Sequence, residues 1–210
     1  MGDCPSSAKE RRSYMAKLKW KPGTMLYPLP AVMVSCGDFE NANIITVAWT
    51  GTICTEPAMV YISVRPERFS YDLIKEKGEF VINLTTKNLA FATDFSGVRS
   101  GRDVDKFEKL NLSKEKANEV SCPLIKESPV NLECKVVEIK ELGSHHMIIA
   151  EVLCVDVDEE YMDENGKFCL EKCDLITYSH GQYYNLGENL GKFGYSVMKN
   201  NKKKSLSSRD

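Results

Sequence analysis

The feature that most constrains the fold of this chain is a series of short apolar runs with β-strand character. The runs are rich in Val and Ile and cover residues 31–36, 44–48, 59–64, 79–84, 131–141 and 146–157. Residues 131–141 roughly alternate apolar and charged side chains, which is typical of an antiparallel strand with one solvated face. The sequence has no regular alternation of strands and helices and no G-x-G-x-x-G motif. A dinucleotide-binding α/β fold is therefore disfavoured. We therefore expect a mainly β fold, an antiparallel barrel with short peripheral helices.

Short helices and turns are expected between these strands. A helix is predicted over residues 69–77, ended by Gly78 in a left-handed conformation. A second helix is predicted over residues 89–95, where Thr86 is a suitable N-terminal cap. A third, from residue 113 to residue 118, is expected in the segment that precedes the two long strands. Late strands are expected near residues 175–178 and 183–186, with a turn between them.

Size and composition place the chain among ordinary globular proteins. At 210 residues, with 42% hydrophobic and 28% charged residues, it is long enough to bury a core without disulfides. We expect an N-terminal extension over residues 1–24, one domain over residues 25–198 and a disordered basic tail over residues 199–210. The formal net charge of -2 offers no general attraction for nucleic acid or an anionic membrane. No apolar run is long enough to span a membrane, and a cytoplasmic location is expected.

Motifs for nucleophilic catalysis are lacking in the sequence. There is no G-x-S-x-G and no phosphate-binding Walker loop, and His145, His146 and His180 are the only histidines. The eight cysteines have no C-x-x-C spacing, and we expect reduced thiols that are mostly buried. A zinc site built from His145 or His146 with cysteines remains an alternative, although its spacing matches no standard pattern. No metal site is predicted.

An anion-binding site is predicted where the helix over residues 69–77 begins. Free backbone N–H groups, the hydroxyl of Ser70 and the guanidinium groups of Arg65 and Arg68 would meet there. Trp49 and a hydroxyl-rich segment over residues 50–57, expected to be a loop, lie nearby in the sequence. Each residue also has a simpler explanation, because Trp49 is equally consistent with a core aromatic and Ser70 with a helix cap.

The loop over residues 97–107 is the second candidate for a functional segment. It contains two glycines and several basic residues, and it is more polar than a core element. Lys106 lies at its end, where an ordinary surface lysine is the alternative interpretation. His145 at a strand-to-strand turn and Tyr178 in a short strand likewise need no functional explanation by themselves.

Taken together, several motifs in one order resemble a known family. They are N-x-x-T-V-A-W from Asn43, R-P-E-R-F-S-Y-D-L-I from Arg65, E-F-V-I-N-L from Glu79, S-G-R-D-V-D-K-F from Ser100, C-P-L-I-K-E-S-P-V-N-L-E-C from Cys122, L-G-S-H-H-M from Leu142 and G-K-F-G-Y-S from Gly191. Together they resemble the flavoredoxin branch of the flavin reductase-like, FMN-binding split-barrel family. The resemblance implies a Greek-key split β-barrel, a homodimer, and FMN held noncovalently near the subunit interface.

The resemblance also implies which positions bind the cofactor. They are Trp49, Thr50 and Gly51 at the isoalloxazine ring, Cys54 and Thr55 near the ribityl chain or ring edge, Arg68, Ser70 and Lys106 at the phosphate, and Asn83, His145 and Tyr178 completing the pocket. His145 and Tyr178 come from the same subunit or from the partner subunit. Ser70, Tyr178 and Cys54 stand where the family often has Thr, Phe and Ser, and the thiol of Cys54 is the weaker hydrogen-bonding group.

The implied function is an FMN-dependent oxidoreductase. FMN accepts a hydride or two electrons and passes them on singly, so no catalytic protein residue is expected. The first hypothesis is a flavin reductase-like enzyme that takes the hydride from NAD(P)H. The alternative is an electron carrier reduced by a partner protein such as ferredoxin. A third hypothesis is a flavin-binding module without turnover.

Overall fold

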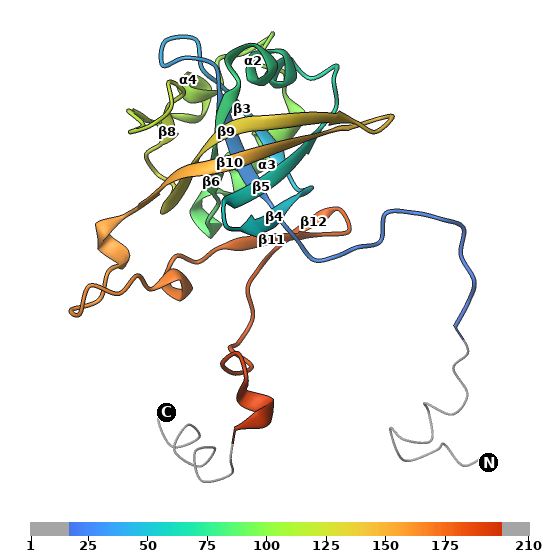
Figure 1. Cartoon of the computed structure of the whole chain (residues 1–210), viewed down its shortest axis with the longest axis vertical. Coiled ribbons are helices and arrows are strands. Elements are labelled where there is room, and N and C mark those ends of the chain that lie inside the picture. Colours follow the sequence, from blue (N-terminus) through green and yellow to red (C-terminus); the bar gives the residue numbers. More distant parts are fainter. Residues whose placement is uncertain (1–16, 199–210) are drawn as a thin grey trace.

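The computed structural model describes residues 17–198, and its centre is a seven-stranded antiparallel sheet curled into a barrel (Figure 1). The order of the strands in the sheet is β3-β2-β6-β9-β10-β5-β4. Their bounds are β2 Val32–Cys36, β3 Asn43–Val47, β4 Thr50–Thr55, β5 Ala58–Val64, β6 Glu79–Leu84, β9 Val130–Glu141 and β10 His146–Val157. The strands predicted from the apolar runs are thus present.

The two edges of this sheet are formed by neighbouring segments of the chain. Strand β3 pairs with β2 and strand β4 pairs with β5, and only Ala48 and Trp49 separate β3 from β4. The backbone N–H of Ser63 donates to the carbonyl of Trp49 over 2.8 Å, which ties this junction to β5. The predicted loop over residues 50–57 is therefore wrong for its first part, because its β-branched residues suit a strand.

The apolar core fills the inside of the barrel. Along β5, alternate side chains Val60, Ile62 and Val64 are buried, as the two-residue period of a strand requires. They pack with buried side chains from the facing strands, such as Phe80 and Ile148. Burying each side chain of this size contributes about 1.5–3 kcal/mol to stability, so this core is a main source of the barrel's stability.

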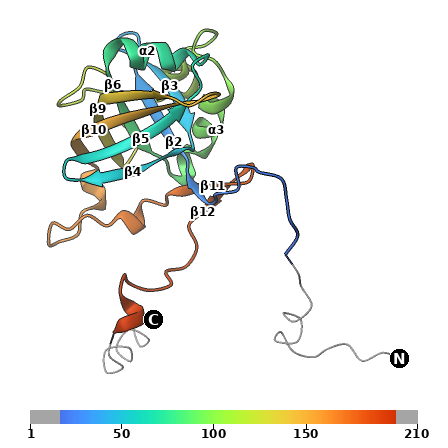
Figure 2. The ribbon, with the colours of Figure 1, turned by 45° about the vertical axis from the view of Figure 1, so that its right-hand side comes forward.

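Helix α2, Phe69–Lys77, closes one end of the barrel (Figure 2). Its residues Tyr71 and Ile74 are buried in the barrel core. The helix ends at Gly78, whose φ of 71° is left-handed, and the Gly78 N–H donates to the Ile74 carbonyl over 2.8 Å. Both the helix and its glycine stop were predicted from the sequence.

A second group of helices covers the neighbouring face. The short 3₁₀ helix Lys87–Leu89 leads into α3, Ala90–Val98, and the Thr86 hydroxyl accepts from the Leu89 N–H as predicted. The next helix, α4 over Lys106–Leu110, was not predicted; the Asp105 carboxylate caps it by accepting from the Glu108 N–H. These helices bring the loop over residues 99–105 against the start of α2.

The predicted helix over residues 113–118 is wrong. Lys114–Glu115 forms strand β7, which pairs with β8, Leu124–Ile125. The backbone N–H groups of residues 118–120 point at the Glu133 carboxylate instead of making helical hydrogen bonds. A long-range partner on β9 thus decides the conformation of this segment.

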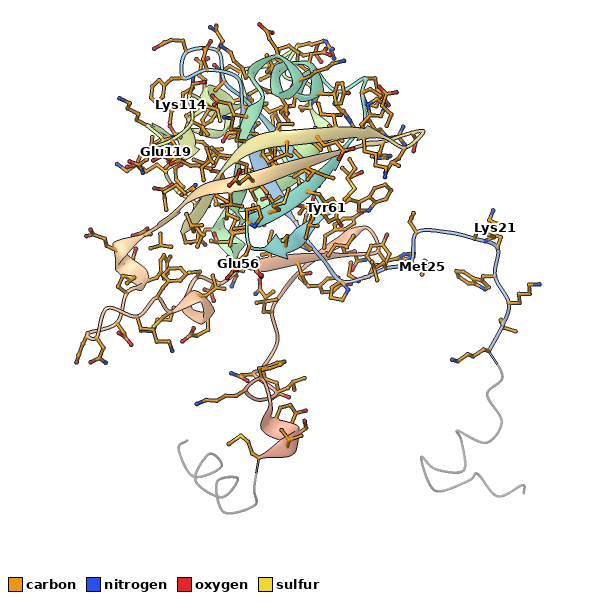
Figure 3. The ribbon with its side chains drawn as sticks, in the orientation of Figure 1. Lys21, Met25, Glu56, Tyr61, Lys114 and Glu119 are labelled. Atoms are coloured by element: carbon orange, nitrogen blue, oxygen red, sulfur yellow. The ribbon has the colours of Figure 1, made fainter. Side chains whose placement is uncertain are left out.

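A small three-stranded sheet lies against the barrel next to β4. It contains β1, Leu29–Pro30, β11, Ile176–Ser179, and β12, Gln182–Asn185, in the order β1-β11-β12. The remaining short 3₁₀ helices are Glu159–Tyr161, Leu170–Lys172 and Tyr195–Val197. The segment that precedes β1 is extended and lies away from the barrel, and Lys21 and Met25 are on it (Figure 3).

Some predictions concern the ends of the chain. Residues 17–24 contain no helix or strand. Residues 1–16 of the predicted N-terminal extension and the predicted tail over residues 199–210 lie outside the described residues. Within residues 17–198 every cysteine is a free thiol and most are buried, as expected. No helix in this part of the chain is long and apolar enough to cross a membrane.

Candidate functional site

Two adjoining cavities lie where the barrel, α2 and α3 meet. One encloses about 490 Å³ and is lined by several aromatic side chains; we call it the aromatic cavity. The other encloses about 480 Å³ and is lined by five basic side chains; we call it the cationic cavity. Ile45, Arg65, Arg68 and Gly97 line both, so the two cavities meet along strand β3 and the turn before α2.

The cationic cavity lies at the N-terminus of α2. Arg68 occupies the cap position of this helix and supplies no side-chain cap, so it leaves the first N–H groups without a capping side chain. Ser70 is 1% exposed and accepts a hydrogen bond from the Asn43 amide over 2.7 Å. Its hydroxyl is held in the cavity lining and does not cap the helix. Helix polarity, two arginines and a fixed hydroxyl make this end suitable for an anion.

Lys106 contributes a buried positive charge to the same cavity. It is only 3% exposed, and its ammonium donates to the carbonyls of Ile44 and Ser96 over 2.5 and 2.9 Å. An ammonium has three N–H donors, so one remains for a ligand. Burial, with a smaller contribution from the charge of Arg68, lowers the pKa of Lys106 to about 8. The alternative of an ordinary surface lysine is thus wrong.

Two further features fit this cavity to a polar ligand. The Ser96 hydroxyl oxygen is buried and has no hydrogen-bond partner among the described residues, which is costly unless a ligand or water supplies one. Gly101 leaves a hollow in the lining, because a Cβ there would lie 2.2 Å from the Asn43 amide oxygen and 2.8 Å from the Phe69 ring. A side chain at residue 101 would therefore displace Asn43.

Gly101→Ala is expected to weaken anion binding in the cationic cavity about fivefold. The new methyl group pushes Asn43 away from Ser70, and a lost hydrogen bond of this kind costs about 1 kcal/mol. Titration with FMN, the phosphate-bearing ligand that the sequence motifs imply, measures the effect. Gly187→Ala is the matched control, since a Cβ at residue 187 meets no atom within 4 Å. Equal affinity for both variants would contradict the proposed close packing.

The aromatic cavity contains Trp49 and His145. Trp49 is 37% exposed, so the interpretation as a core aromatic is wrong. Its ring lies 4.6 Å from the His145 ring, at an angle of 43°. Burial lowers the pKa of His145, and the nearby Arg65 adds to this effect. Both effects favour the neutral imidazole, and the two inclined rings offer an aromatic surface with one polar edge.

The small sheet forms the other wall of the aromatic cavity. Tyr178 on β11 and Tyr183 on β12 line it, with their rings 5.5 Å apart in an edge-to-face arrangement. Tyr27, which precedes β1, lies 6.3 Å from Tyr178. Burial, together with the charge of Asp94, raises the pKa of Tyr183 to about 12. Tyr178 thus reaches the cavity from the same chain as Trp49 and Arg68.

Several of the predicted cofactor positions do not line either cavity. Thr50, Gly51, Cys54 and Thr55 lie along β4, beyond Trp49. The Thr50 hydroxyl donates to the Tyr61 carbonyl over 2.6 Å and is thereby occupied. Within one chain, then, this strand borders the site only through the Trp49 junction.

Asn83 was predicted near the cofactor, and the structure places it in the core. It is fully buried, and its amide nitrogen donates to the carbonyls of Met33 and Val81. Its amide oxygen accepts from the Ile125 N–H and from the Asn131 amide. The side chain therefore joins β2, β6, β8 and β9, and its role is structural.

The sequence alone did not single out every residue of the site. Arg99 and Arg102 line the cationic cavity, and their only signal was the basic character of the loop over residues 97–107. Tyr27 and Tyr183 gave no signal, because an aromatic residue in a short strand has many ordinary explanations. Ile45, Thr46 and Val47 of β3 also line the aromatic cavity, which follows only from the position of β3 at the sheet edge.

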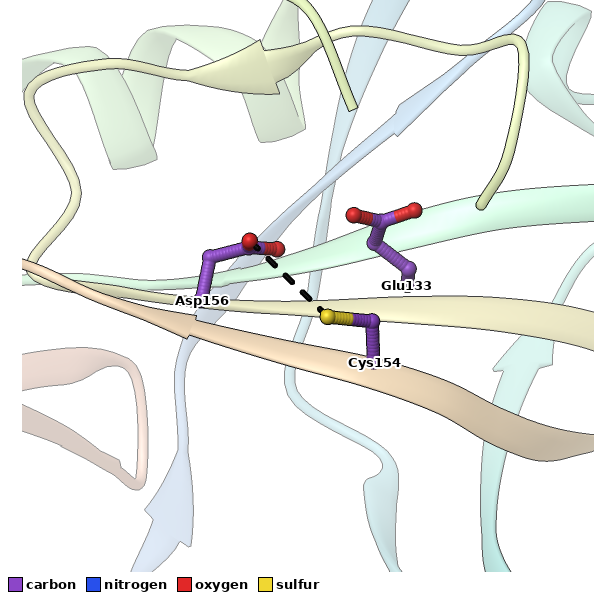
Figure 4. A group of neighbouring side chains, drawn as sticks. All are labelled: Glu133, Cys154 and Asp156. Carbon is purple, nitrogen blue, oxygen red and sulfur yellow. Dashed lines mark hydrogen bonds between the residues drawn. The ribbon is translucent and has the colours of Figure 1, made fainter. Parts of the chain in front are cut away.

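The zinc alternative finds no support among the described residues. The group of potential ligands whose atoms all lie within 4.8 Å of one another is Glu133, Cys154 and Asp156, and it contains no histidine (Figure 4). The oxygens of Glu133 already accept three backbone N–H groups, over 2.6 to 3.0 Å. Burial and the neighbouring Glu133 raise the pKa of Asp156. The cluster is best explained as a structural polar contact between β9, β10 and the segment after β7.

Comparison with known proteins agrees with this fold. A flavoredoxin of Desulfovibrio vulgaris (Miyazaki F) has a similar structure, with a TM-score of 0.80, 29% identity, and coverage of 87% of this chain and 100% of that chain. For a flavoredoxin from Methanosarcina acetivorans the TM-score is 0.78, the identity 27%, and the coverage 88% of this chain and 100% of that chain. An uncharacterized protein of Archaeoglobus fulgidus is 34% identical over 138 residues, 66% of this chain and 77% of that protein.

The family model for the flavin reductase like domain matches residues 24–187. This match covers most of the chain and includes both cavities, from Tyr27 to Tyr183. It confirms the family and the mainly β split-barrel class that the sequence motifs indicated. The chain is therefore a member of the flavin reductase-like domain family.

Proposed function

We propose that this protein binds FMN across the two cavities and acts as an FMN-dependent oxidoreductase. The observation that carries the proposal is the junction of a cationic cavity with an aromatic one, at Arg65 and Arg68. FMN has the matching form, a phosphate dianion joined by a flexible chain to a flat aromatic ring system. The similarity to flavoredoxins supports the same reading.

Each end of the site has a distinct task. Arg68, Ser70 and the third N–H donor of Lys106 would hold the phosphate, which prefers charge-assisted hydrogen bonds. Trp49, His145 and Tyr178 would hold the isoalloxazine ring by stacking and would exclude water from its face. The redox chemistry is supplied by FMN when bound, and the protein's residues bind and orient it.

Absorbance titration of the purified protein with FMN tests this proposal most directly. We expect flavin absorbance to remain with the protein after gel filtration and Trp49 fluorescence to be quenched, because the ring would lie beside this side chain. Trp20→Phe leaves Trp49 as the remaining tryptophan and isolates its signal. A protein that retains no flavin at any FMN concentration would rule out the proposed function.

The electron donor is the finer part of the proposal, and we propose NAD(P)H. Anaerobic stopped-flow mixing of the FMN-loaded protein with NADH or NADPH should bleach the flavin band. A flavin that stays oxidised with both nicotinamides, yet is reduced by reduced ferredoxin, would replace this part of the proposal by an electron carrier. A flavin reduced by neither would leave a binding module without turnover.

FMN affinity is expected to fall as the pH rises above about 8. Bound phosphate favours the charged form of Lys106, so its pKa is higher in the complex than the value of about 8 in the free protein. Affinity is therefore greatest below this pH and decreases by up to about tenfold per pH unit above it. Fluorescence titration from about pH 7 to pH 10 measures the slope. Lys106→Met should remove the slope, and an unchanged slope in that variant would contradict the assignment.

We also propose that two copies of the chain associate along β4. This strand is at the edge of the sheet, its Ile53 side chain is exposed, and Cys54 and Thr55 line neither cavity of their own chain. A second copy would cover these residues and bring them to its own site. Light scattering should therefore give twice the mass of 23.7 kDa, and Ile53→Asp should reduce it to one copy. A wild-type protein that stays single at high concentration would contradict this arrangement.

A further inference from the structure

The cationic cavity carries more positive charge than one phosphate requires. Its lining contains Arg65, Arg68, Arg99, Arg102 and Lys106. Glu67 is the one acidic residue among its lining residues. A phosphate monoester has a charge of about −1.5 to −2 at pH 7, which two cations neutralise. Arg68 and the buried Lys106, beside Ser70, already meet this need.

Arg102 is held in place at the mouth of this cavity. Its guanidinium donates to the Glu67 carbonyl over 3.2 Å and lies 3.5 Å from the Asp72 carboxylate. It also stacks over the Phe69 ring, with 5.3 Å between the guanidinium carbon and the ring centre. These contacts fix its orientation before any ligand arrives, which lowers the entropic cost of binding.

Arg99 has no such partner. Its side chain is exposed on the same loop as Arg102. It makes no ion pair or hydrogen bond to any of residues 17–198. Arg65 differs, because Glu67 lies 3.2 Å from it. The mouth of the cavity thus presents one oriented arginine and one unpaired arginine, on either side of Gly101.

The size of the cationic cavity allows a second anionic group. A phosphate group fills roughly the space of two or three waters, at about 30 Å³ each. The cavity of about 480 Å³ therefore has room beyond the phosphate of FMN. An arginine can donate two parallel hydrogen bonds to a phosphate, so the arginines at its mouth suit a second phosphate better than a neutral group.

We propose that Arg99 and Arg102 form a second phosphate subsite, which takes the diphosphate of a dinucleotide. This inference rests on the proposed function, because it extends the site that holds the FMN phosphate. Two sources share the required chemistry: FAD bound in place of FMN, and NAD(P)H bound beside FMN. The diphosphate of either would reach the mouth of the cavity while the flavin ring occupies the aromatic cavity.

The first experiment compares the affinities of the flavin-free protein for riboflavin, FMN and FAD. In Arg99→Met and in Arg102→Met we expect FAD binding to weaken about tenfold or more, with FMN binding changed by less than about twofold. Lys75→Met, an exposed lysine on α2 outside the cavity lining, is the matched control. Arg99→Met is the more informative variant, because the Arg99 side chain makes no hydrogen bond or ion pair within residues 17–198 that its loss could disturb.

The second experiment identifies the source of the diphosphate. ADP-ribose, which has the diphosphate and no flavin or nicotinamide, is titrated into the FMN-loaded protein and into the flavin-free protein. Binding to the FMN-loaded protein that Arg99→Met weakens about tenfold assigns the subsite to the nicotinamide dinucleotide. An effect of the variant on FAD alone assigns it to the flavin dinucleotide.

Two results would overturn the inference. Equal weakening of FMN and FAD in Arg99→Met would place this arginine on the single FMN phosphate. Unchanged affinity for FAD and for ADP-ribose in both arginine variants would show that the arginines are only solvated surface groups. Failure of the proposed function looks different, since no flavin of any kind would then bind.

Discussion

Replacing Arg68 and Lys106 together by methionine is expected to weaken FMN binding about 10²–10⁴-fold. Each charge-assisted hydrogen bond to the phosphate contributes about 1.5–3 kcal/mol, and the double variant loses one from each residue. Methionine matches the buried Lys106 side chain out to Cε and lacks its ammonium group, so the change removes charge more than volume. Fluorescence titration of the flavin-free proteins with FMN gives the dissociation constants of the wild type and of the double variant.

Riboflavin provides the control for this variant, because it has the flavin ring and no phosphate. Its affinity should change by less than about threefold if the two cations act only on the phosphate. Lys75→Met, on the exposed side of α2, should leave FMN binding unchanged. Equal weakening of riboflavin and FMN would show that the variant disturbs the fold of the cavity, and unchanged FMN affinity would remove both residues from the phosphate site.

Glu133→Gln is expected to lower the free energy of unfolding by about 3 kcal/mol. Glu133 is fully buried, and its two oxygens accept from the N–H groups of Asn118, Glu119 and Val120. In the variant an amide NH₂ replaces one oxygen and faces donors, so buried N–H groups lose their acceptor. For a domain of this size we expect the midpoint of thermal unfolding to fall by about 6–12 °C.

Glu138→Gln tests whether the effect comes from burial. Glu138 lies on the same strand β9 and is exposed, so its replacement should change stability by no more than about 0.5 kcal/mol. Urea unfolding followed by circular dichroism measures both variants. Equal stability of Glu133→Gln and the wild type would contradict the structural role of the carboxylate.

The local elements near the site were predictable because their signals lie within a few residues. The Val and Ile runs indicated the strands, and Thr86 and Gly78 marked where helical segments begin and end. The start of α2, with Arg65, Arg68 and Ser70 close together, already indicated an anion site. Helix polarity and a cluster of cations are properties of one short segment, so they need no tertiary contact to be recognised.

The errors have a common physical cause, which is partners distant in the sequence. The segment after residue 113 is held by Glu133 on β9, and no local pattern shows that partner. Asn83 was placed near the cofactor, whereas hydrogen bonds to β2, β8 and β9 bury it in the core. Strand β4 was expected to be a loop, because its sequence is rich in hydroxyl groups. Its β-branched residues form a strand through pairing with β5, which the local sequence does not show.

The sequence by itself therefore determined the β character, the family and the gathering of Arg65, Arg68 and Ser70 at the start of α2. Tertiary structure decided that Lys106 is buried with a pKa of about 8, and that the rings of Trp49 and His145 lie in contact in a cavity that Tyr178 also lines. It also decided which residues of the opening motif face the cavities and which lie along β4. Burial, pKa and ring contacts depend on what packs around a side chain, and segments as far apart in the sequence as Tyr27 and Tyr178 supply that packing here.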